Sequence, residues 1–375
     1  MPQSNRKLGG VSRLKAAGPT AGPTAPAHAD FVYNGGPVIV CPLIFATFWG
    51  SDWSDAAHQT QSARLIQFLK DLVASTWMNI MSQYGSGTGQ GSGMFIQSSF
   101  ISSVPATLTD ASIHTVIQNA INSGAIPEPP ANNATNVIVI FLDESVAVND
   151  PGLGVVMCEP TSDNAFGYHY DFVTAKGNNC YYAVIPALDD TCINETCPGG
   201  TGCSLTLAET QEQRRTQVAS HEFAEMITDP KFPTGWFGPQ SDENGDICNG
   251  ETATITAGAN TWNVQRIYSK TDDIATNGAS FCLAFAPSPI PKLAGGPTAV
   301  ATMPEVSPER FAAYKGFLPL PTAHFDAAAG KASFDEDHVH KFARQFFYPL
   351  HHSNIIGDMA SAMRHFADIL EKGKK

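Results

Sequence analysis

The strongest constraint on the fold is the run NVIVIFL at residues 136–142, in which every residue after the first is large and apolar. Such a run, rich in β-branched and aromatic residues, is typical of a strand that is buried on both faces of a sheet. Two further strand-like runs, at 37–48 and 95–104, precede it, and each is followed by apolar residues at helical spacing. The order strand, helix, strand, helix, strand predicts an α/β fold with a mixed sheet and flanking helices, and an α+β arrangement remains open.

Two helices are predicted between these strands. Asp55 can cap the first, which is expected to run to about Gln83, and Asp110 starts the second. Both carry apolar residues three and four positions apart, so each has one face that can pack on the sheet.

The stretch VASHEFAEMITDP at 218–230 ends a predicted helix of about 205–227, because Pro230 cannot continue a helix. His221 and Glu225 are four residues apart, so they share one face and can offer two ligands to one metal ion. Glu222 stands where zinc proteases of the His-Glu-x-x-His type have their general base, and Glu225 replaces the second His. The pattern predicts a zincin-like helix with Glu222 as a catalytic residue. The alternative is a hydrogen-bonded polar network without a metal.

Further site residues are expected outside this helix. Glu243 and Asp246 are the best candidates for a third metal ligand, and His169 is a second candidate catalytic residue that could also ligate the ion. Zinc with three protein ligands and one open position fits this set. Several carboxylate ligands would also suit a harder ion, so calcium is the alternative. The acidic residues at 242–246 do not form an EF-hand, because the sixth and twelfth positions are Ile247 and Ala253.

The charge balance excludes one class of partner. The formal net charge is −13 and no basic stripe offsets it, so nucleic acid is not an expected partner. The apolar run at 38–49 is too short to span a bilayer, so no transmembrane segment is expected. No apolar region follows the basic residues near the start, so no signal peptide is evident.

The eight cysteines point to an oxidising compartment. Six of them lie between residues 158 and 248, with spacings that do not match a zinc ribbon. We therefore expect disulfides within 158–282. Cys248–Cys282 is the pair that we predict specifically, because these residues flank the last β segment.

Composition divides the chain into four parts. Residues 1–30 are rich in Gly, Pro, Ala and Thr and are expected to be a disordered arm. Residues 31–283 form the predicted α/β domain. Residues 284–310 are predicted to be a proline-rich linker, and 311–375 a small helical tail.

A series of short motifs adds a resemblance. In chain order they are Tyr33-x-Gly35-Gly36-Pro37-Val38, Phe48-Trp49-Gly50 with Trp53, Tyr168-His169, Tyr182-Ala183-Val184-Ile185-Pro186, His221-Glu222-x-Ala224-Glu225-x-Ile227-Thr228-Asp229-Pro230, Gly235-Trp236 and Glu243-x-x-Asp246-x-Cys248. Together they resemble the Exordium-like (phosphate-induced protein) family over about residues 31–283. The resemblance implies a secreted or cell-wall setting, and it implies that Glu225 is characteristic of the family.

Two functions are therefore expected. The first is a metal-dependent hydrolase, most simply a zincin-like peptidase with a peptide substrate. The second is a non-catalytic extracellular module that binds a cell-wall polysaccharide or a partner protein. In that case Trp49, Trp53, Trp236 and Trp262 would offer stacking faces to sugars. The sequence leaves the oligomeric state open.

Overall fold

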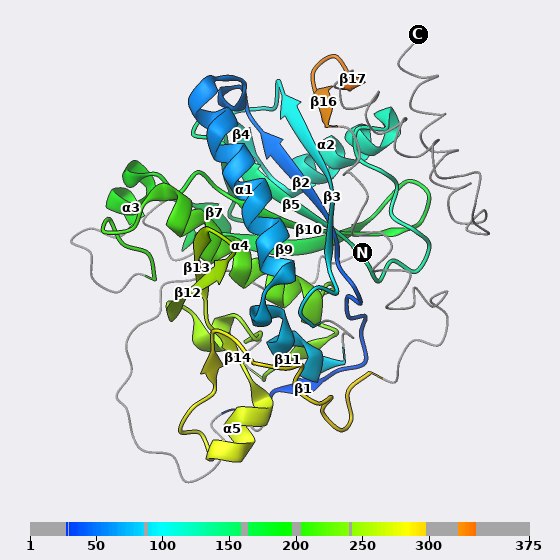
Figure 1. Ribbon diagram of the computed structural model, residues 1–375. Helices are drawn as coiled ribbons and strands as arrows, with labels where there is room; N and C mark the ends of the chain where they lie inside the picture. The colour runs from blue at the N-terminus through cyan, green and yellow to red at the C-terminus, as the bar shows by residue number, and fades with distance from the viewer. Residues whose placement is uncertain are drawn as a thin grey trace, which may run out of the picture.

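A seven-stranded mixed sheet forms the centre of the computed structural model, in the order β17-β16-β3-β2-β5-β10-β9 (Figure 1). The described residues are 28, 30–85, 89–158, 164–196, 204–239, 242–297 and 322–334. Strands β16, β3, β2, β5 and β10 run parallel, and β9 and β17 pair antiparallel at the two edges. The strands are β2 (Leu43–Trp49), β3 (Met94–Ser102), β5 (Asn136–Leu142), β9 (Tyr168–Val173), β10 (Asn179–Ile185), β16 (Ala323–Asp326) and β17 (Lys331–Phe334). The predicted α/β class with a mixed sheet is confirmed.

Helices cover both faces of the sheet (Figure 1). Helices α1 (Ala56–Ala74) and α4 (Gln211–Thr228) pack on one face, and α2 (Asp110–Ser123) packs on the other. Along β5, Val137, Val139 and Phe141 enter the first core, whereas the alternating residues enter the second. This burial on both faces explains why the run at 136–142 carries no polar residue after Asn136.

The first predicted helix is shorter than expected. Asp55 caps α1 by accepting a hydrogen bond from the backbone N–H of His58, as predicted. The chain turns to an extended conformation at Ser75, with ψ of 163°, and continues as the 3-10 helix η2 (Thr76–Tyr84). The hydroxyl of Ser75 accepts from the N–H of Trp77, so a second cap inside the apolar pattern divides the predicted helix in two.

Smaller elements complete the fold. They are β1 (Val32–Tyr33), η1 (Asp52–Ser54), β4 (Thr107–Leu108), β6 (Ala147–Asp150), β7 (Val155–Met157), β8 (Asn164–Ala165), α3 (Asp190–Thr196), β11 (Trp236–Phe237), η3 (Asp246–Cys248), β12 (Thr252–Ala257), β13 (Asn260–Gln265), β14 (Ile267–Tyr268), α5 (Lys270–Thr276) and β15 (Cys282–Leu283).

A third apolar cluster fixes the loop that follows β11. Phe31, Tyr84, Trp236 and Tyr268 form its aromatic centre, with Phe31 and Trp236 stacked at 6.0 Å between ring centroids. Ile247 and Cys248 of η3 belong to the same cluster. The preceding loop, with Glu243 and Asp246, is therefore attached to a packed core.

Two disulfides lie in the described residues. Cys248–Cys282 joins η3 to β15, which confirms the predicted pair. Cys158–Cys192 joins the end of β7 to α3. Among the described cysteines, Cys41 and Cys180 are free thiols. Cys197 and Cys203 lie outside the described residues.

The chain after residue 283 differs from the predicted linker. Residues 284–297 pack against η2, and Ala286, Ile290 and Leu293 donate backbone hydrogen bonds to the carbonyls of Thr76, Asn79 and Gln83. This proline-rich segment is thus bound to the core through backbone hydrogen bonds to η2.

The predicted helical tail also needs correction. Its residues 322–334 contain the β16–β17 hairpin, and β16 extends the main sheet by pairing with β3. Ala323 and Phe325 are buried in the second core. The remainder of the predicted linker and tail lies outside the described residues, as do residues 1–27 and 29 of the predicted arm.

Candidate metal centre

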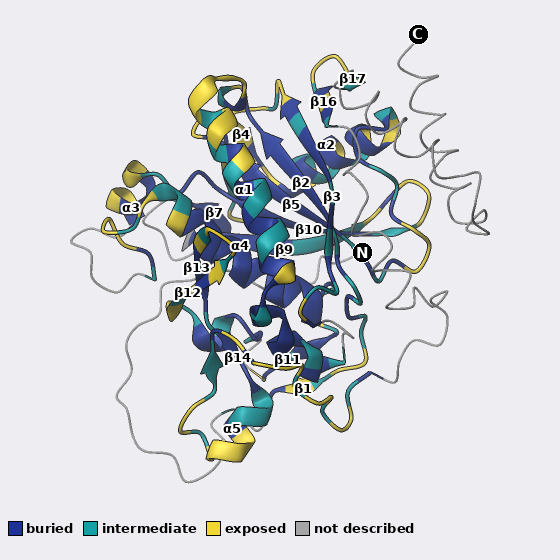
Figure 2. Ribbon diagram, viewed as in Figure 1, coloured by how far each residue is buried: buried dark blue, intermediate teal, exposed yellow. Residues whose placement is uncertain are grey.

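Helix α4 supplies most of the centre. It begins with a capping box, in which Thr210 and Gln213 exchange side-chain to backbone hydrogen bonds, and it ends at Thr228 before Asp229 and Pro230. Every residue from Arg214 to Thr228 is buried, as the dark blue of α4 shows in Figure 2. The polar residues of the motif at 218–230 therefore face the protein interior and not solvent.

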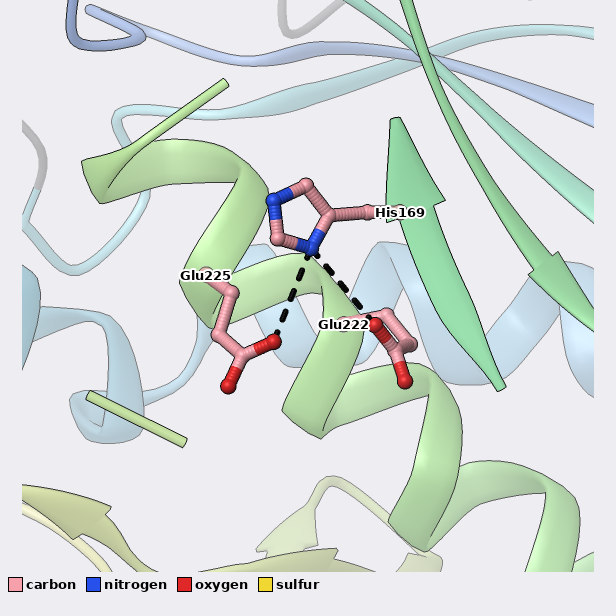
Figure 3. Close-up of side chains that lie close together, drawn as sticks. All are labelled: His169, Glu222 and Glu225. Atoms are coloured by element: carbon pink, nitrogen blue, oxygen red, sulfur yellow. Dashed lines mark ion pairs between the residues drawn. The ribbon is translucent and has the colours of Figure 1, made fainter. Parts of the chain in front are cut away.

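Strand β9 and the loop before η3 complete the centre. His169 lies on β9 and points toward Glu222 and Glu225 on α4 (Figure 3). Asp246 begins η3, and its backbone N–H donates to Glu225 Oε1 at 3.0 Å. Three segments distant in sequence thus converge, and the side chains of His169, His221, Glu222 and Glu225 are fully buried.

The first potential ligand group is His221, Glu225 and Asp246. The Nε2 atom of His221 lies 3.1 Å from Glu225 Oε1 and 3.8 Å from Asp246 Oδ1. Neither ring nitrogen of His221 has a hydrogen-bond partner within the described chain. Since buried polar atoms are normally satisfied, a ring nitrogen close to two carboxylates without a hydrogen bond is an arrangement that a bound cation would satisfy.

The second potential group is His169, Glu222 and Glu225. The Nδ1 atom of His169 lies 3.6 Å from Glu222 Oε2 and 3.5 Å from Glu225 Oε2. Its Nε2 atom lies 3.3 Å from the carbonyl oxygen of Asp229. A buried His/Glu/Glu group that could hold a metal ion is therefore present, in agreement with the coarse prediction of a metal site.

Glu243 takes a different place from Asp246. Its Oε1 atom lies 3.6 Å from Nε2 of His169, on the side of that ring away from Glu222 and Glu225. Of the two residues predicted as the third ligand, Asp246 therefore lies with His221 and Glu225, while Glu243 lies beside His169.

The electrostatics of the metal-free cluster follow from burial and crowding. Burial opposes the imidazolium form of His221, but Glu225 outweighs it and raises the pKa of His221 to about 10. Burial likewise opposes ionisation of Glu225, but His221 and His169 lower the pKa of Glu225 to about 2. Burial raises the pKa of Glu222 to about 7, although His169 acts against it. Without a metal, the two rings carry the compensating positive charge.

Three residues at the centre were not predicted from the sequence. The carbonyl of Asp229 contacts His169, and burial raises the pKa of its own carboxyl group to about 6. Gly167 and Gly245 approach the cluster so closely that an added Cβ would lie 2.9 Å from Glu222 Oε1 and 2.7 Å from Glu225 Oε1, respectively. Gly167 lies two positions before His169, and Gly245 lies one position before Asp246. This closeness to predicted site residues was the one sign in the sequence that the two glycines lie at the centre.

The predicted tryptophan surface is wrong. Trp49, Trp53, Trp236 and Trp262 are each at most 2% exposed. Their indole groups fill the cores, and the N–H of Trp262, for example, donates to Asp71. They cannot stack on a sugar at the surface.

Comparisons with protein-family models, with curated proteins and with solved structures found no match to this chain. Within the described residues, no helix has both the length and the apolar character needed to cross a membrane. The function must therefore be inferred from the cluster itself, together with the disulfides and the motifs.

Proposed function

We propose that this protein is a metal-dependent hydrolase, most simply a zincin-like peptidase, with one ion held by His221, Glu225 and Asp246. The observation that carries the proposal is the buried group of these three side chains, in which the nitrogens of His221 lie among carboxylate oxygens without a hydrogen bond. A cation at this point would satisfy them together.

Zinc fits the donor set. One ring nitrogen and two carboxylate oxygens leave an open position on a four-coordinate ion, as in catalytic zinc sites. Two anionic ligands weaken the Lewis acidity of the ion, so calcium is the alternative that metal analysis must test.

Each residue has a distinct part in the proposed reaction. A bound ion would supply polarisation of the scissile carbonyl group. Glu222 adjoins the ligand His221 in the chain and would accept the proton of the attacking water as general base. His169 lies 3.6 Å from Glu222 and would hold that carboxylate in position.

The setting is proposed to be extracellular or associated with the cell wall. Two disulfides support an oxidising compartment, because such bonds are rare in the cytosol. The resemblance to the Exordium-like family points the same way. The proposed substrate is a peptide.

The deep burial of the cluster favours a second candidate, a non-catalytic module with a structural ion. The side chains of His221, Glu222 and Glu225 are 0% exposed, and Asp246 is 20% exposed. In such a module the metal would join α4 to the loop before η3, and the partner would be a cell-wall polysaccharide or a protein that binds elsewhere on the surface.

The test is metal analysis of protein purified without a His tag, together with three variants. We expect about one zinc per chain, and loss of that ion with a lower Tm in His221→Ala and Glu225→Ala, because a ligand bound only by the folded state stabilises it. Glu222→Gln should keep the ion and the Tm, while hydrolysis of labelled casein falls by about 10²–10⁴-fold.

The outcomes separate the two candidates. An ion in all preparations with no casein hydrolysis by the unaltered protein supports the structural module. Absence of any ion, with the same Tm in the presence of chelator, would contradict both metal-binding candidates. In that case each of the three substitutions should still cost about 1–3 kcal/mol through unpaired buried groups.

A further inference from the structure

Glu225 belongs to both ligand groups, which are His221, Glu225, Asp246 and His169, Glu222, Glu225. We infer that the centre can bind a second divalent metal ion in the group His169, Glu222 and Glu225, and that this ion is coordinated by Glu222, the proposed general base. The inference rests on the proposed function, since it concerns the same site. It assigns a regulatory state to that site, in which excess metal inhibits the enzyme.

The two carboxylate oxygens of Glu225 face different rings. Oε1 lies 3.1 Å from Nε2 of His221, and Oε2 lies 3.5 Å from Nδ1 of His169. A carboxylate that presents one oxygen to each of two nitrogen donors has the geometry of a bridge between two ions. Bridged ions about 3.5–4 Å apart are common in hydrolases.

The hydrogen bond of His169 prepares this ring for a metal. Nε2 lies 3.3 Å from the carbonyl oxygen of Asp229, to which its N–H can donate, so when a metal ion replaces the proton on Nδ1, the neutral ring keeps its remaining proton on Nε2. The Nδ1 lone pair is then directed toward Glu222 and Glu225, and Nδ1 has no hydrogen-bond partner in the described chain. Metal-bound histidines usually have their other ring nitrogen fixed by such a carbonyl.

The local charge also favours a second cation. Glu222, Glu225, Asp229 and Glu243 are fully buried, and Asp246 adjoins them. Among the described residues of the centre, two histidines face these five carboxyl groups. Buried anions are costly unless they are paired, and of the group His169, Glu222 and Glu225 the first ion would contact Glu225 alone. A second divalent ion of the zinc type, which accepts nitrogen and oxygen donors, would compensate them.

The functional consequence follows from the position of Glu222. As a ligand of the second ion, its carboxylate can no longer accept a proton from water. The chain with one ion would be active, and the chain with two ions would be inactive. His169 belongs to the second group and not to the first. Its substitution should therefore prevent binding of the second ion and leave the first ion in place.

The inference is tested by titrating the metal-free full chain with Zn²⁺. Calorimetry measures the binding, and metal analysis counts the bound ions. We expect the tighter ion in the group with His221 and a weaker one in the group with His169. His169→Gln should bind one ion fewer than the unaltered chain, and His58→Gln, on the surface at the start of α1, should bind the same number. Casein hydrolysis by the unaltered chain should fall by about 10²–10⁴-fold as the weaker ion binds. His169→Gln should start from a lower rate, because Glu222 has lost its support, but this rate should not fall further as Zn²⁺ is added.

Co²⁺ gives a readout on the unaltered chain, so the test does not depend on how well His169→Gln folds. Two Co²⁺ ions bridged by Glu225 should show magnetic coupling in their electron paramagnetic resonance spectra. Equal ion counts in the unaltered chain and His169→Gln, or two ions without coupling, would overturn the inference and leave the proposed function intact. A chain that binds no ion at all would overturn both.

Discussion

At the residue scale, the centre is enclosed by backbone that approaches its side chains closely. Gly245 is the clearest case. Its φ of −77° is accessible to any residue, so its backbone conformation does not require glycine. An added Cβ, however, would lie 2.7 Å from Glu225 Oε1 and 2.9 Å from His221 Nδ1. Space alone demands glycine here, because both neighbours are buried ligand candidates that cannot move freely.

Gly245→Ala is therefore expected to displace Glu225 and His221 and to lower the free energy of unfolding by about 1–3 kcal/mol, the usual cost of overpacking. Zinc affinity should fall as well, because both displaced side chains are proposed ligands. Denaturant unfolding and a zinc titration measure the two effects. The matched control is Gly238→Ala, whose Cβ would meet its nearest atom at an ordinary 3.7 Å. Equal effects of the two substitutions would show that a Cβ at position 245 does not displace Glu225 or His221.

At the element scale, His58 makes two ionic contacts at the start of α1, one of which joins this helix to the loop after β5. His58 Nδ1 lies 2.7 Å from Asp55, the N-cap of α1, and Nε2 lies 2.8 Å from Glu144. Arg215 of α4 also faces Glu144, at 3.9 Å. Burial lowers the pKa of His58, but Glu144 and Asp55 outweigh burial and raise it above its ordinary value.

This raised pKa predicts a pH-dependent contribution to stability. A His that is more basic in the folded state stabilises it fully below the unfolded pKa of about 6.5, and the stabilisation is lost as pH rises through the folded pKa. The difference in Tm between the unaltered protein and His58→Gln should thus be larger at pH 6 than at pH 8.5. Thermal unfolding at both pH values measures it. A difference independent of pH would contradict an ionic role for His58.

A second element-scale feature holds the loop of the site. The Cys248–Cys282 disulfide closes a loop with a sequence separation of 34, for which chain entropy gives about 3–4 kcal/mol. Cys248 is the last residue of η3, and Asp246 is its first. The bridge therefore stabilises the element that brings a proposed ligand to α4.

At the scale of the whole molecule, the β16–β17 hairpin belongs to the central sheet. It covers the edge of β3, which would otherwise present unpaired backbone groups. Phe325 on β16 is 1% exposed and packs in the core on the α2 face. The β16–β17 hairpin thus forms one structural unit with strands β2, β3 and β5.

Phe325→Ala should accordingly lower the free energy of unfolding by about 3–5 kcal/mol, as for other buried phenylalanines. Phe285→Ala is the control, because Phe285 is 62% exposed and its loss should change stability by no more than about 0.5 kcal/mol. Denaturant unfolding of both variants gives the comparison. A small effect for Phe325→Ala would mean that the hairpin is a separate tail, as the sequence alone suggested.

The sequence by itself determined the features that depend on local periodicity. The run at 136–142 coincides with β5, and the start of the second helix coincides with that of α2, since a continuous apolar run and a helix start are both recognised within a few residues. His221 and Glu225 share a face of α4 for the same reason. The start of α4 was expected at about 205, but the capping box of Thr210 and Gln213 places it at Gln211.

The tertiary structure alone decided what depends on contacts between distant segments. It placed Asp246 beside His221, Glu243 beside His169, and the carbonyl of Asp229 against the ring of His169. It buried the four tryptophans and added β16 to the sheet. No local pattern encodes these contacts, because each depends on how two segments far apart in sequence meet when the cores on the two faces of the sheet close.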